Sequence, residues 1–310
     1  MVTRRTLVTA AGAAAVAAPL AGLGAARARD AAGFRFGVVA DPQYAPIAPD
    51  RIRNRYHANS LWKLSEAIAA FNADPEIRFV VTLGDVIDRG WESFSHILPL
   101  YDALEHEAVF VLGNHDHEVA AEWLGSVVRA VGMPAPYHDF AAGGFRFVVL
   151  DGNDVSLFGP PPGDPRRALA QERLAALRAA GADNARTWNG SLSDAQVVWL
   201  EERLAAAARA GERVVVLCHY PVHPANLHNL WDSDRLIELV IGQPHVVAWL
   251  GGHNHAGGYG EVDGVHFVTF RGMVDTPTTT AYAIVEVLPD RIEIRGFGRE
   301  ESRTLPLRSR

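Results

Sequence analysis

Cysteine is almost absent from this sequence, whose 310 residues contain a single one, Cys218. One cysteine cannot form an intrachain disulfide, and nothing around it resembles a metal site built from thiolates. Basic residues are fewer than acidic ones: the chain has 29 Lys and Arg and 36 Asp and Glu, which gives a formal net charge of −7. Binding to the phosphates of nucleic acid needs a basic surface, so we expect no nucleic-acid partner. A small phosphate ester can still bind if metal ions supply the positive charge.

Long apolar runs are missing beyond the N-terminus, and no internal repeat is evident. At the N-terminus, Arg4 and Arg5 precede a weakly hydrophobic stretch rich in Ala and Gly, and residues 26–28 form an A-x-A cleavage site. This pattern is similar to a twin-arginine export signal, and it predicts that residues 1–28 are removed and the mature chain is periplasmic or extracellular. The alternative is a retained membrane anchor, because about 20 apolar residues can span a bilayer. After cleavage we expect no stable association with a membrane.

Short apolar runs rich in Val, Ile and Phe recur along the rest of the chain and predict strands. Near-continuous runs of this length are typical of strands buried on both faces. They span residues 34–41, 78–85, 108–116, 145–151, 213–220 and 245–255. Near the C-terminus we expect successive strands joined by turns, at residues 265–272, 280–288 and 291–298.

Helical spacing of apolar residues predicts helices at 58–72, 166–180 and 194–210. The last of these has Ser193 as N-cap with Gln196 three positions later, a capping-box pattern. Alternation of strands and helices is typical of a layered α/β domain, and the strand-rich C-terminus indicates that the sheet is mixed. No linker divides the chain, so residues 29–310 are expected to form a single domain.

Metal-capable side chains follow five of the predicted strands. They are Asp41 with Gln43, Asp85 with Asp88, Asn114 with His115 and Asp116, His219, and His253 with His255. In layered α/β sheets ligands bind at the carboxyl ends of strands, so these side chains are expected to converge. Each fragment alone is weak evidence, whereas the ordered set of five predicts a metal site. Carboxylate, amide and imidazole donors without a thiolate suit manganese, iron or zinc.

The ordered fragments D-x-Q, GD-x-x-D, GNHD, H and GH-x-H resemble those of the calcineurin-like metallophosphoesterase superfamily over residues 34–300. Within it, several segments are similar to the manganese-dependent ADP-ribose/CDP-alcohol diphosphatases, and Gln43 in place of a second His fits that subgroup. These segments include ADPQYA (40–45), NSLWKL (59–64), WNGSLSDAQVVWLEERL (188–204), CHYPVHP (218–224) and GGHNHAGGY (251–259). The resemblance implies the metallo-dependent phosphatase fold, a four-layer αββα sandwich with two mixed β-sheets.

The resemblance also implies a dinuclear centre with two divalent metal ions, manganese first and iron or zinc as alternatives. Asp85 has two carboxylate oxygens and can bridge the two ions. One ion would be held by Asp41, Asp85 and His255, with Gln43 as a weaker or water-mediated ligand. The other would be held by Asp85, Asn114, His219 and His253. A hydroxide shared by the ions would then attack phosphorus in line with the leaving group.

His115 is not assigned to metal in this scheme, and it is expected to act as electrophile or general acid toward the leaving oxygen. Asp116 is expected to orient the His115 ring, and Asp88 is expected to accept a hydrogen bond from a metal ligand. The alternative for both carboxylates is a plain structural role as caps of the helices that follow.

Five residues in the segments that resemble the subfamily are candidate substrate contacts: Tyr44, Asn59, Asn189, Gly190 and Tyr259. An aromatic ring can stack on a base, and an amide can bind phosphate or ribose hydroxyls. The alternative for each is local loop structure. The run RYHANS (55–60) departs from the subfamily pattern, because His57 and Ala58 replace a tyrosine and an arginine. If that arginine grips the far phosphate, substrate choice differs here.

These patterns predict a phosphoesterase that hydrolyses the phosphoanhydride or phosphodiester of a nucleotide-linked small molecule of the ADP-ribose or CDP-alcohol type. A cyclic-nucleotide or glycerophosphodiester phosphodiesterase and a phosphomonoesterase are alternatives that share the same metal set. Ligand spacing cannot separate them, because loop residues such as 44–59 and 158–193 select the substrate. A metal-binding module without catalysis is disfavoured, since His115 accompanies a complete ligand set.

Overall fold

The computed structural model describes residues 33–308 of the chain. The predicted export signal at residues 1–28 lies outside the described residues. Within the described part, no helix has both the length and the apolar character needed to cross a bilayer.

The first of two six-stranded sheets has β1 (Phe34–Val39) as an inner strand. β1 and β2, and β2 and β3, pair in parallel, whereas β10, β11 and β12 join the other side of β1 in antiparallel pairs. This sheet is therefore mixed, in the order β12-β11-β10-β1-β2-β3. The other strands are β2 (Ile77–Leu83), β3 (Glu107–Val111), β10 (Ala281–Val287), β11 (Arg291–Gly298) and β12 (Arg303–Pro306).

The second sheet is also mixed, in the order β4-β5-β6-β7-β9-β8. Its four inner strands, β5, β6, β7 and β9, run parallel, and β4 and β8 close the two edges with antiparallel pairs. The strands are β4 (His138–Ala142), β5 (Phe145–Leu150), β6 (Arg213–Cys218), β7 (Val246–Gly251), β8 (Gly258–Val262) and β9 (Val265–Thr269).

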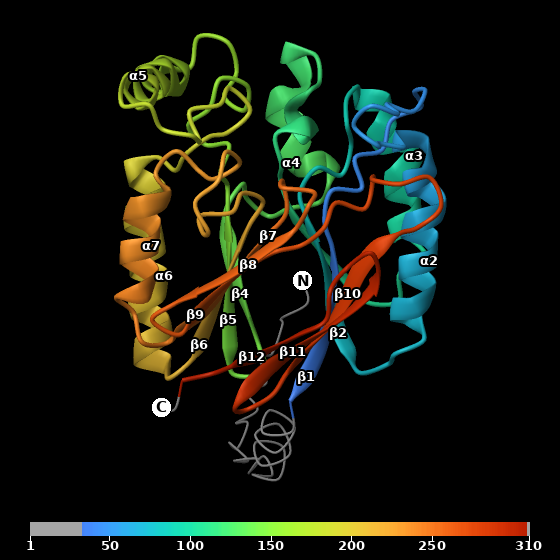
Figure 1. Ribbon diagram of the computed structural model, residues 1–310, viewed down its shortest axis with the longest axis vertical. Helices are drawn as coiled ribbons and strands as arrows, with labels where there is room; N and C mark the ends of the chain where they lie inside the picture. The colour runs from blue at the N-terminus through green and yellow to red at the C-terminus, as the bar shows by residue number, and fades with distance from the viewer. Residues whose placement is uncertain (1–32, 309–310) are drawn as a thin grey trace, which may run out of the picture.

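The two sheets pack face to face with helices on both outer sides, as Figure 1 shows, with α6 and α7 at the left and α2 and α3 at the right. Aromatic rings fill the space between the sheets: Phe79 of the first sheet lies 5.0 Å from Phe147 of the second, measured between ring centroids. On β5, alternate residues face opposite sides, because Phe147 belongs to this central core and Val148 to the core under α6 and α7. Each sheet is covered by the other sheet on one face and by helices on the other, which explains why its strands are continuous apolar runs in the sequence. The predicted four-layer αββα sandwich is confirmed.

The helices predicted at 58–72, 166–180 and 194–210 are present as α2 (Ser60–Asn72), α5 (Pro165–Ala179) and α6 (Asp194–Ala210). At the start of α6 the Ser193 hydroxyl accepts a hydrogen bond from the Gln196 backbone N–H at 3.2 Å, as the capping pattern predicts. The remaining helical segments are η1 (His57–Asn59), α3 (Trp91–Tyr101), η2 (His115–His117), η3 (Ala121–Ser126), α4 (Val127–Ala130) and α7 (Ser233–Ile241). The longer two were missed because α3 contains Pro99 and α7 has only nine residues.

The expectation of successive C-terminal strands joined by turns is wrong at one point. β9 pairs with β7 in the second sheet, whereas β10 pairs with β1 in the first. The connecting residues 270–280 therefore cross between the sheets, and they pass directly beside the end of β1. The backbone N–H groups of Met273 and Val274 donate to the carbonyls of Ala40 and Asp41 at 2.8 and 3.0 Å. We call residues 273–276 the crossover strap.

Lys63 holds the crossover strap to α2. It is the only lysine of the chain, and its side chain is fully buried. Its ammonium lies 2.7–3.1 Å from the backbone carbonyl oxygens of all four strap residues. A compact ammonium with three rotatable donors can serve converging carbonyls, which the planar guanidinium of Arg cannot do in the same space.

We expect Lys63→Met to lower the free energy of unfolding by at least about 2 kcal/mol, because it leaves several buried carbonyls without a donor. Urea unfolding of metal-free protein measures this. The control is Ser65→Ala on the exposed face of the same helix, for which a change within about 0.5 kcal/mol is expected. Equal stabilities of the two variants would contradict the role given to Lys63.

Candidate metal centre

The side chains predicted to converge leave the carboxyl ends of β1, β2 and β3 in the first sheet and of β6 and β7 in the second. These ends meet at one edge of the sandwich, at the top of Figure 1. The two sheets thus contribute to one site, although their strands are far apart in the sequence. The expected convergence is confirmed by two ligand clusters, Asp85 with His219 and His253, and Asp41 with Asp85 and His255.

Backbone conformation at this edge is strained. Asp41, Gln43, Asp85 and His253 have φ values of 48°, 46°, 51° and 65°, in the left-handed region that side chains other than Gly seldom adopt. Each such residue costs about 1–3 kcal/mol and persists only where its surroundings enforce it. Here the turns after β1 and β2 are bonded together, since the Gln43 N–H donates to the Asp85 carbonyl at 2.7 Å. These backbone conformations therefore place the carboxylates of Asp41 and Asp85 side by side.

The first cluster has one carboxylate and two imidazoles, all buried. His219 Nε2 lies 3.5 Å from Asp85 Oδ2 and 3.1 Å from His253 Nδ1. The other nitrogen of His219, Nδ1, lies 2.8 Å from the Leu83 carbonyl, to which it donates. This hydrogen bond leaves Nε2 with its lone pair toward Asp85 and His253, which is the tautomer that a metal requires.

Asp85 also belongs to the second cluster, in which all ligand atoms lie within 4.8 Å of one another. His255 Nε2 lies 3.5 Å from Asp41 Oδ1. The Nδ1 of the same ring lies 2.9 Å from the carboxylate of Asp275 in the crossover strap. A carboxylate behind a ligating histidine fixes the ring and raises its basicity. Asp275 was missed at the sequence level, because it lies 20 residues away in a segment without a recognisable motif.

The residues present fit a pair of divalent ions. Gln43 Oε1 and Asn114 Oδ1 are buried oxygen atoms without a hydrogen-bond partner among the described residues. Such atoms are costly unless something satisfies them, and a cation at this place does so. The complete donor set is oxygen and nitrogen without sulfur, which suits manganese, iron or zinc. Cys218 is no exception, since it lies in the core under α6 and α7.

The ionisable side chains of the two clusters shift one another's pKa values. Burial raises the pKa of Asp41 against the opposing influence of His255, whereas His219 and His115 hold the pKa of Asp85 far below its usual range despite burial. Burial opposes protonation of His219, but Asp85 outweighs it and raises the pKa of His219 to about 9. Ligands bind metal in their deprotonated form, so the raised pKa of His219 makes metal binding weaken as the pH falls.

The prediction that Asp116 orients His115 is wrong. His115 Nδ1 lies 3.0 Å from the Asp88 carbonyl oxygen and 3.5 Å from the Asp88 carboxylate. Asp116 is instead buried, and it accepts hydrogen bonds from the backbone N–H groups of Gly113 and Ile87 at 2.9 and 3.2 Å. It joins the turn after β3 to the turn after β2. The reason is geometric, because adjacent residues of a tight turn point in different directions.

Asp88 also differs from its prediction, because its carboxylate accepts no hydrogen bond from a proposed metal ligand. Its oxygens lie 3.5 Å from the ring nitrogens of His57 and His115 and 2.6 Å from Arg89 Nε. Asp88, rather than Asp116, is thus the residue that positions His115.

None of the five candidate substrate contacts lines the metal pocket. Tyr44 is buried with its hydroxyl 3.1 Å from His96, and Tyr259 on β8 has its hydroxyl 3.1 Å from His266. Asn59 donates to the Pro277 carbonyl at 2.9 Å, and Gly190 packs closely against the Gly152 carbonyl. These four residues make local contacts, and their contact with substrate stays a prediction.

Asn189 has a different role from the predicted one. It is fully buried, and its Oδ1 lies 2.9 Å from Nε2 of His253. Its amide nitrogen donates to the carbonyls of Asn184 and Leu227 at 3.0 and 2.9 Å, which fixes the orientation of the amide. Asn189 therefore leaves Nδ1 of His253 free for metal, in the same way that the Leu83 carbonyl acts on His219.

The metal pocket has a volume of about 320 Å³. Its lining combines six of the predicted site residues with five that sequence reasoning missed. The additional ones are Arg53, Arg55, Glu118, Trp188 and His228. Two arginines beside a metal centre suit a substrate with more than one phosphate. Arg55 and Trp188 lie in RYHANS (55–60) and WNGSLSDAQVVWLEERL (188–204), but neither segment shows from sequence which of its side chains faces the metals.

We expect Asp275→Ala to weaken manganese binding by about 10–100-fold, the usual cost of removing the partner of a ligating histidine. Titration calorimetry of the metal-free protein measures the change, which should affect one of two binding steps. Asp290→Ala, in the exposed turn between β10 and β11, is the control and should bind both ions normally. Unchanged manganese affinity in Asp275→Ala would contradict this role.

Comparison with known proteins agrees with this geometry. Residues 34–257 match the calcineurin-like phosphoesterase family. A manganese-dependent ADP-ribose/CDP-alcohol diphosphatase of Arabidopsis thaliana is 29% identical, covering 87% of this chain and 96% of the relative. The mouse protein of the same name is 28% identical over 88% of this chain and 93% of its own length. A crystal structure of a dimetal phosphatase from Danio rerio superposes with a TM-score of 0.79 at 26% identity, covering 89% of this chain and 99% of that one.

Proposed function

We propose that this chain, which belongs to the calcineurin-like phosphoesterase family, hydrolyses the phosphoanhydride of a nucleoside diphosphate joined to a sugar or an alcohol. The chain is a metal-dependent phosphohydrolase with two divalent ions, and its relatives are named for manganese, ADP-ribose and CDP-alcohols. The observation that supports the substrate class most directly is the pocket. Two ligand clusters share Asp85, and Arg53 and Arg55 line the same cavity.

Two divalent ions, when bound, neutralise phosphoryl charge and make water a stronger nucleophile at neutral pH. The chain supplies the remaining functions. Arg53 and Arg55 can pair with the oxygens of the second phosphate, which stabilises charge that develops on the leaving group. His115 is held through Nδ1 by the Asp88 carbonyl, so its Nε2 is the nitrogen left for the leaving oxygen.

We expect the Mn²⁺-loaded protein to release AMP from ADP-ribose and CMP from CDP-choline. It should hydrolyse cyclic AMP, glycerophosphocholine and p-nitrophenyl phosphate at least about tenfold more slowly, since these lack a second phosphate for the arginines. Product analysis with residues 29–310 and each substrate tests this expectation. Preference for cyclic AMP or glycerophosphocholine would be consistent with a metal-dependent phosphoesterase, but it would overturn the proposed substrate class. No turnover with two ions bound would favour the non-catalytic alternative.

We also propose that the mature domain, residues 29–310, is exported. The support is the sequence alone: paired arginines, an Ala/Gly-rich stretch and a cleavage site at residues 26–28. Mass spectrometry should find an exported form that begins at Arg29, and Arg4→Lys with Arg5→Lys should keep the chain in the cytoplasm. A full-length form in the membrane fraction would support the retained anchor.

A further inference from the structure

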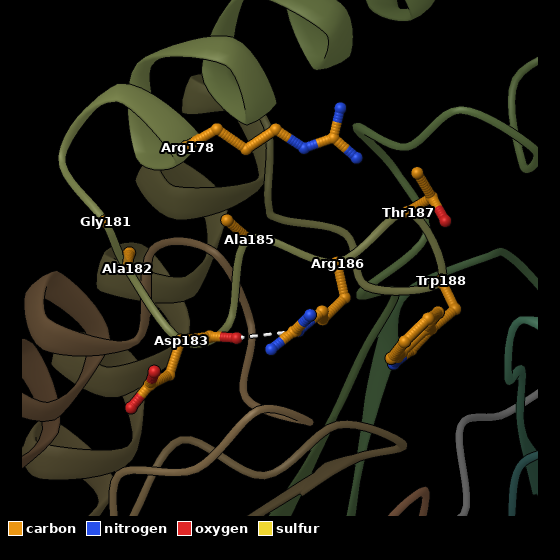
Figure 2. A pocket seen from close by; sticks show the side chains of 8 residues that line it. All are labelled: Arg178, Gly181, Ala182, Asp183, Ala185, Arg186, Thr187 and Trp188. Carbon is orange, nitrogen blue, oxygen red and sulfur yellow. Dashed lines mark hydrogen bonds between the residues drawn. The ribbon is translucent and has the colours of Figure 1, made fainter.

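A second cavity of about 400 Å³ lies beside the metal pocket, and the side chain of Trp188 lines both. Figure 2 shows this second cavity between the end of α5 and the loop that follows it. Its lining residues are Arg178, Gly181, Ala182, Asp183, Ala185, Arg186, Thr187 and Trp188. Trp188 is 41% exposed, so its indole is accessible to a ligand that extends from one cavity into the other.

The second cavity is positively charged, although the chain as a whole is acidic. Within residues 33–308, the Arg178 guanidinium has no hydrogen-bond or ion-pair partner, and the Arg186 side chain donates only through Nε, to the Asp183 carbonyl at 3.0 Å. Figure 2 shows the Asp183 carboxylate directed away from both guanidinium groups. The terminal nitrogens of both arginines are therefore available to an anion, and guanidinium donors match the oxygens of a phosphate.

The loop that carries Arg186 and Trp188 is fixed relative to the metal centre. Trp231 Nε1 donates to the Arg186 carbonyl at 3.1 Å, and Asn184 donates to the Leu230 carbonyl at 2.7 Å. The same loop ends in Asn189, which holds His253. A ligand at the metals therefore meets Arg186 and Trp188 at a defined place rather than on a freely moving loop.

We propose that the second cavity binds an additional phosphate carried on the nucleoside of the substrate. The phosphoanhydride lies at the metal centre, the planar base or ribose contacts Trp188, and the additional phosphate pairs with Arg178 and Arg186. This inference rests on the proposed function, and it narrows the substrate class to nucleoside diphosphate esters that are phosphorylated at the 2′ or 3′ position.

The test is calorimetric binding of three mononucleotides to the Mn²⁺-loaded protein. AMP is the product expected from an adenosine diphosphate ester, and adenosine 2′,5′-bisphosphate and 3′,5′-bisphosphate add one remote phosphate. We expect one bisphosphate to bind at least about tenfold more tightly than AMP. Arg178→Gln with Arg186→Gln should remove this preference. Arg129→Gln with Arg209→Gln changes net charge equally at exposed positions and should retain it.

Equal binding of AMP and both bisphosphates would overturn the inference, and so would a preference that survives in the Arg178→Gln/Arg186→Gln variant. A preference lost equally in the Arg129→Gln/Arg209→Gln variant would show an effect of net charge only. The outcome is separable from the proposed function, because binding is measured without turnover. If the protein did not hydrolyse ADP-ribose but kept its preference for a bisphosphate, the proposed reaction would be overturned. The proposed phosphate site in the second cavity would still stand.

Discussion

Asp85→Asn is expected to lower kcat for ADP-ribose by at least about 10³-fold, equivalent to roughly 4 kcal/mol of transition-state stabilisation. Asp85 is the ligand that the two clusters share, with one oxygen 3.5 Å from His219 Nε2. An amide has no negative charge and one oxygen, so it cannot serve two cations. We therefore expect the metal content, measured by mass spectrometry of the purified protein, to fall together with kcat.

Asp232→Asn provides a matched control. Asp232 is a half-buried residue directly before α7, outside the metal pocket, and its carboxylate accepts a hydrogen bond from the Leu192 N–H at 3.2 Å. Its substitution should leave two ions bound and kcat within about threefold of the unmodified protein. If Asp85→Asn retained both ions and most of its activity, Asp85 would not bridge them.

His115→Gln is expected to lower kcat for ADP-ribose by about 10²–10⁴-fold while both ions remain bound. His115 lines the metal pocket but belongs to neither ligand cluster, and its Nδ1 is engaged by the Asp88 carbonyl at 3.0 Å. Loss of Nε2 removes the proposed proton donor to the leaving oxygen. The p-nitrophenolate of a nucleoside 5′-phosphate p-nitrophenyl ester leaves without a proton, whereas the methoxide of the corresponding methyl ester needs one. Hydrolysis of the methyl ester should therefore fall much more than that of the p-nitrophenyl ester.

His117→Gln is the control for this experiment. The His117 ring lies close to Phe158, and neither of its nitrogens has a hydrogen-bond partner among the described residues. The His117→Gln variant should leave the ratio of the hydrolysis rates of the two esters unchanged. Equal losses for the methyl and p-nitrophenyl esters in His115→Gln, or loss of metal in that variant, would contradict the assignment of His115 as proton donor.

The inner strands and long helices could be predicted because burial on both faces leaves a direct record in the sequence. Val214 and Val215 of β6, for example, are both buried, one under α6 and α7 and one between the sheets. Edge strands leave a weaker record. β4 is only half-buried along its length, and β8 contains two glycines among five residues, so neither was predicted. The assignment of β9 and β10 to different sheets depends on pairing partners that are far away in the chain.

By itself the sequence determined which residues gather at the candidate metal centre, because each of them follows a buried strand and strand ends meet at one edge of a layered sheet. Tertiary structure alone decided what each of them can do. The nitrogen that His219, His253 and His255 present is set by the Leu83 carbonyl, Asn189 and Asp275, which come from other segments. The pocket walls likewise come from loops whose side-chain directions depend on packing. Sequence periodicity records burial, whereas hydrogen-bond partners and cavity walls are products of contacts between distant parts of the chain.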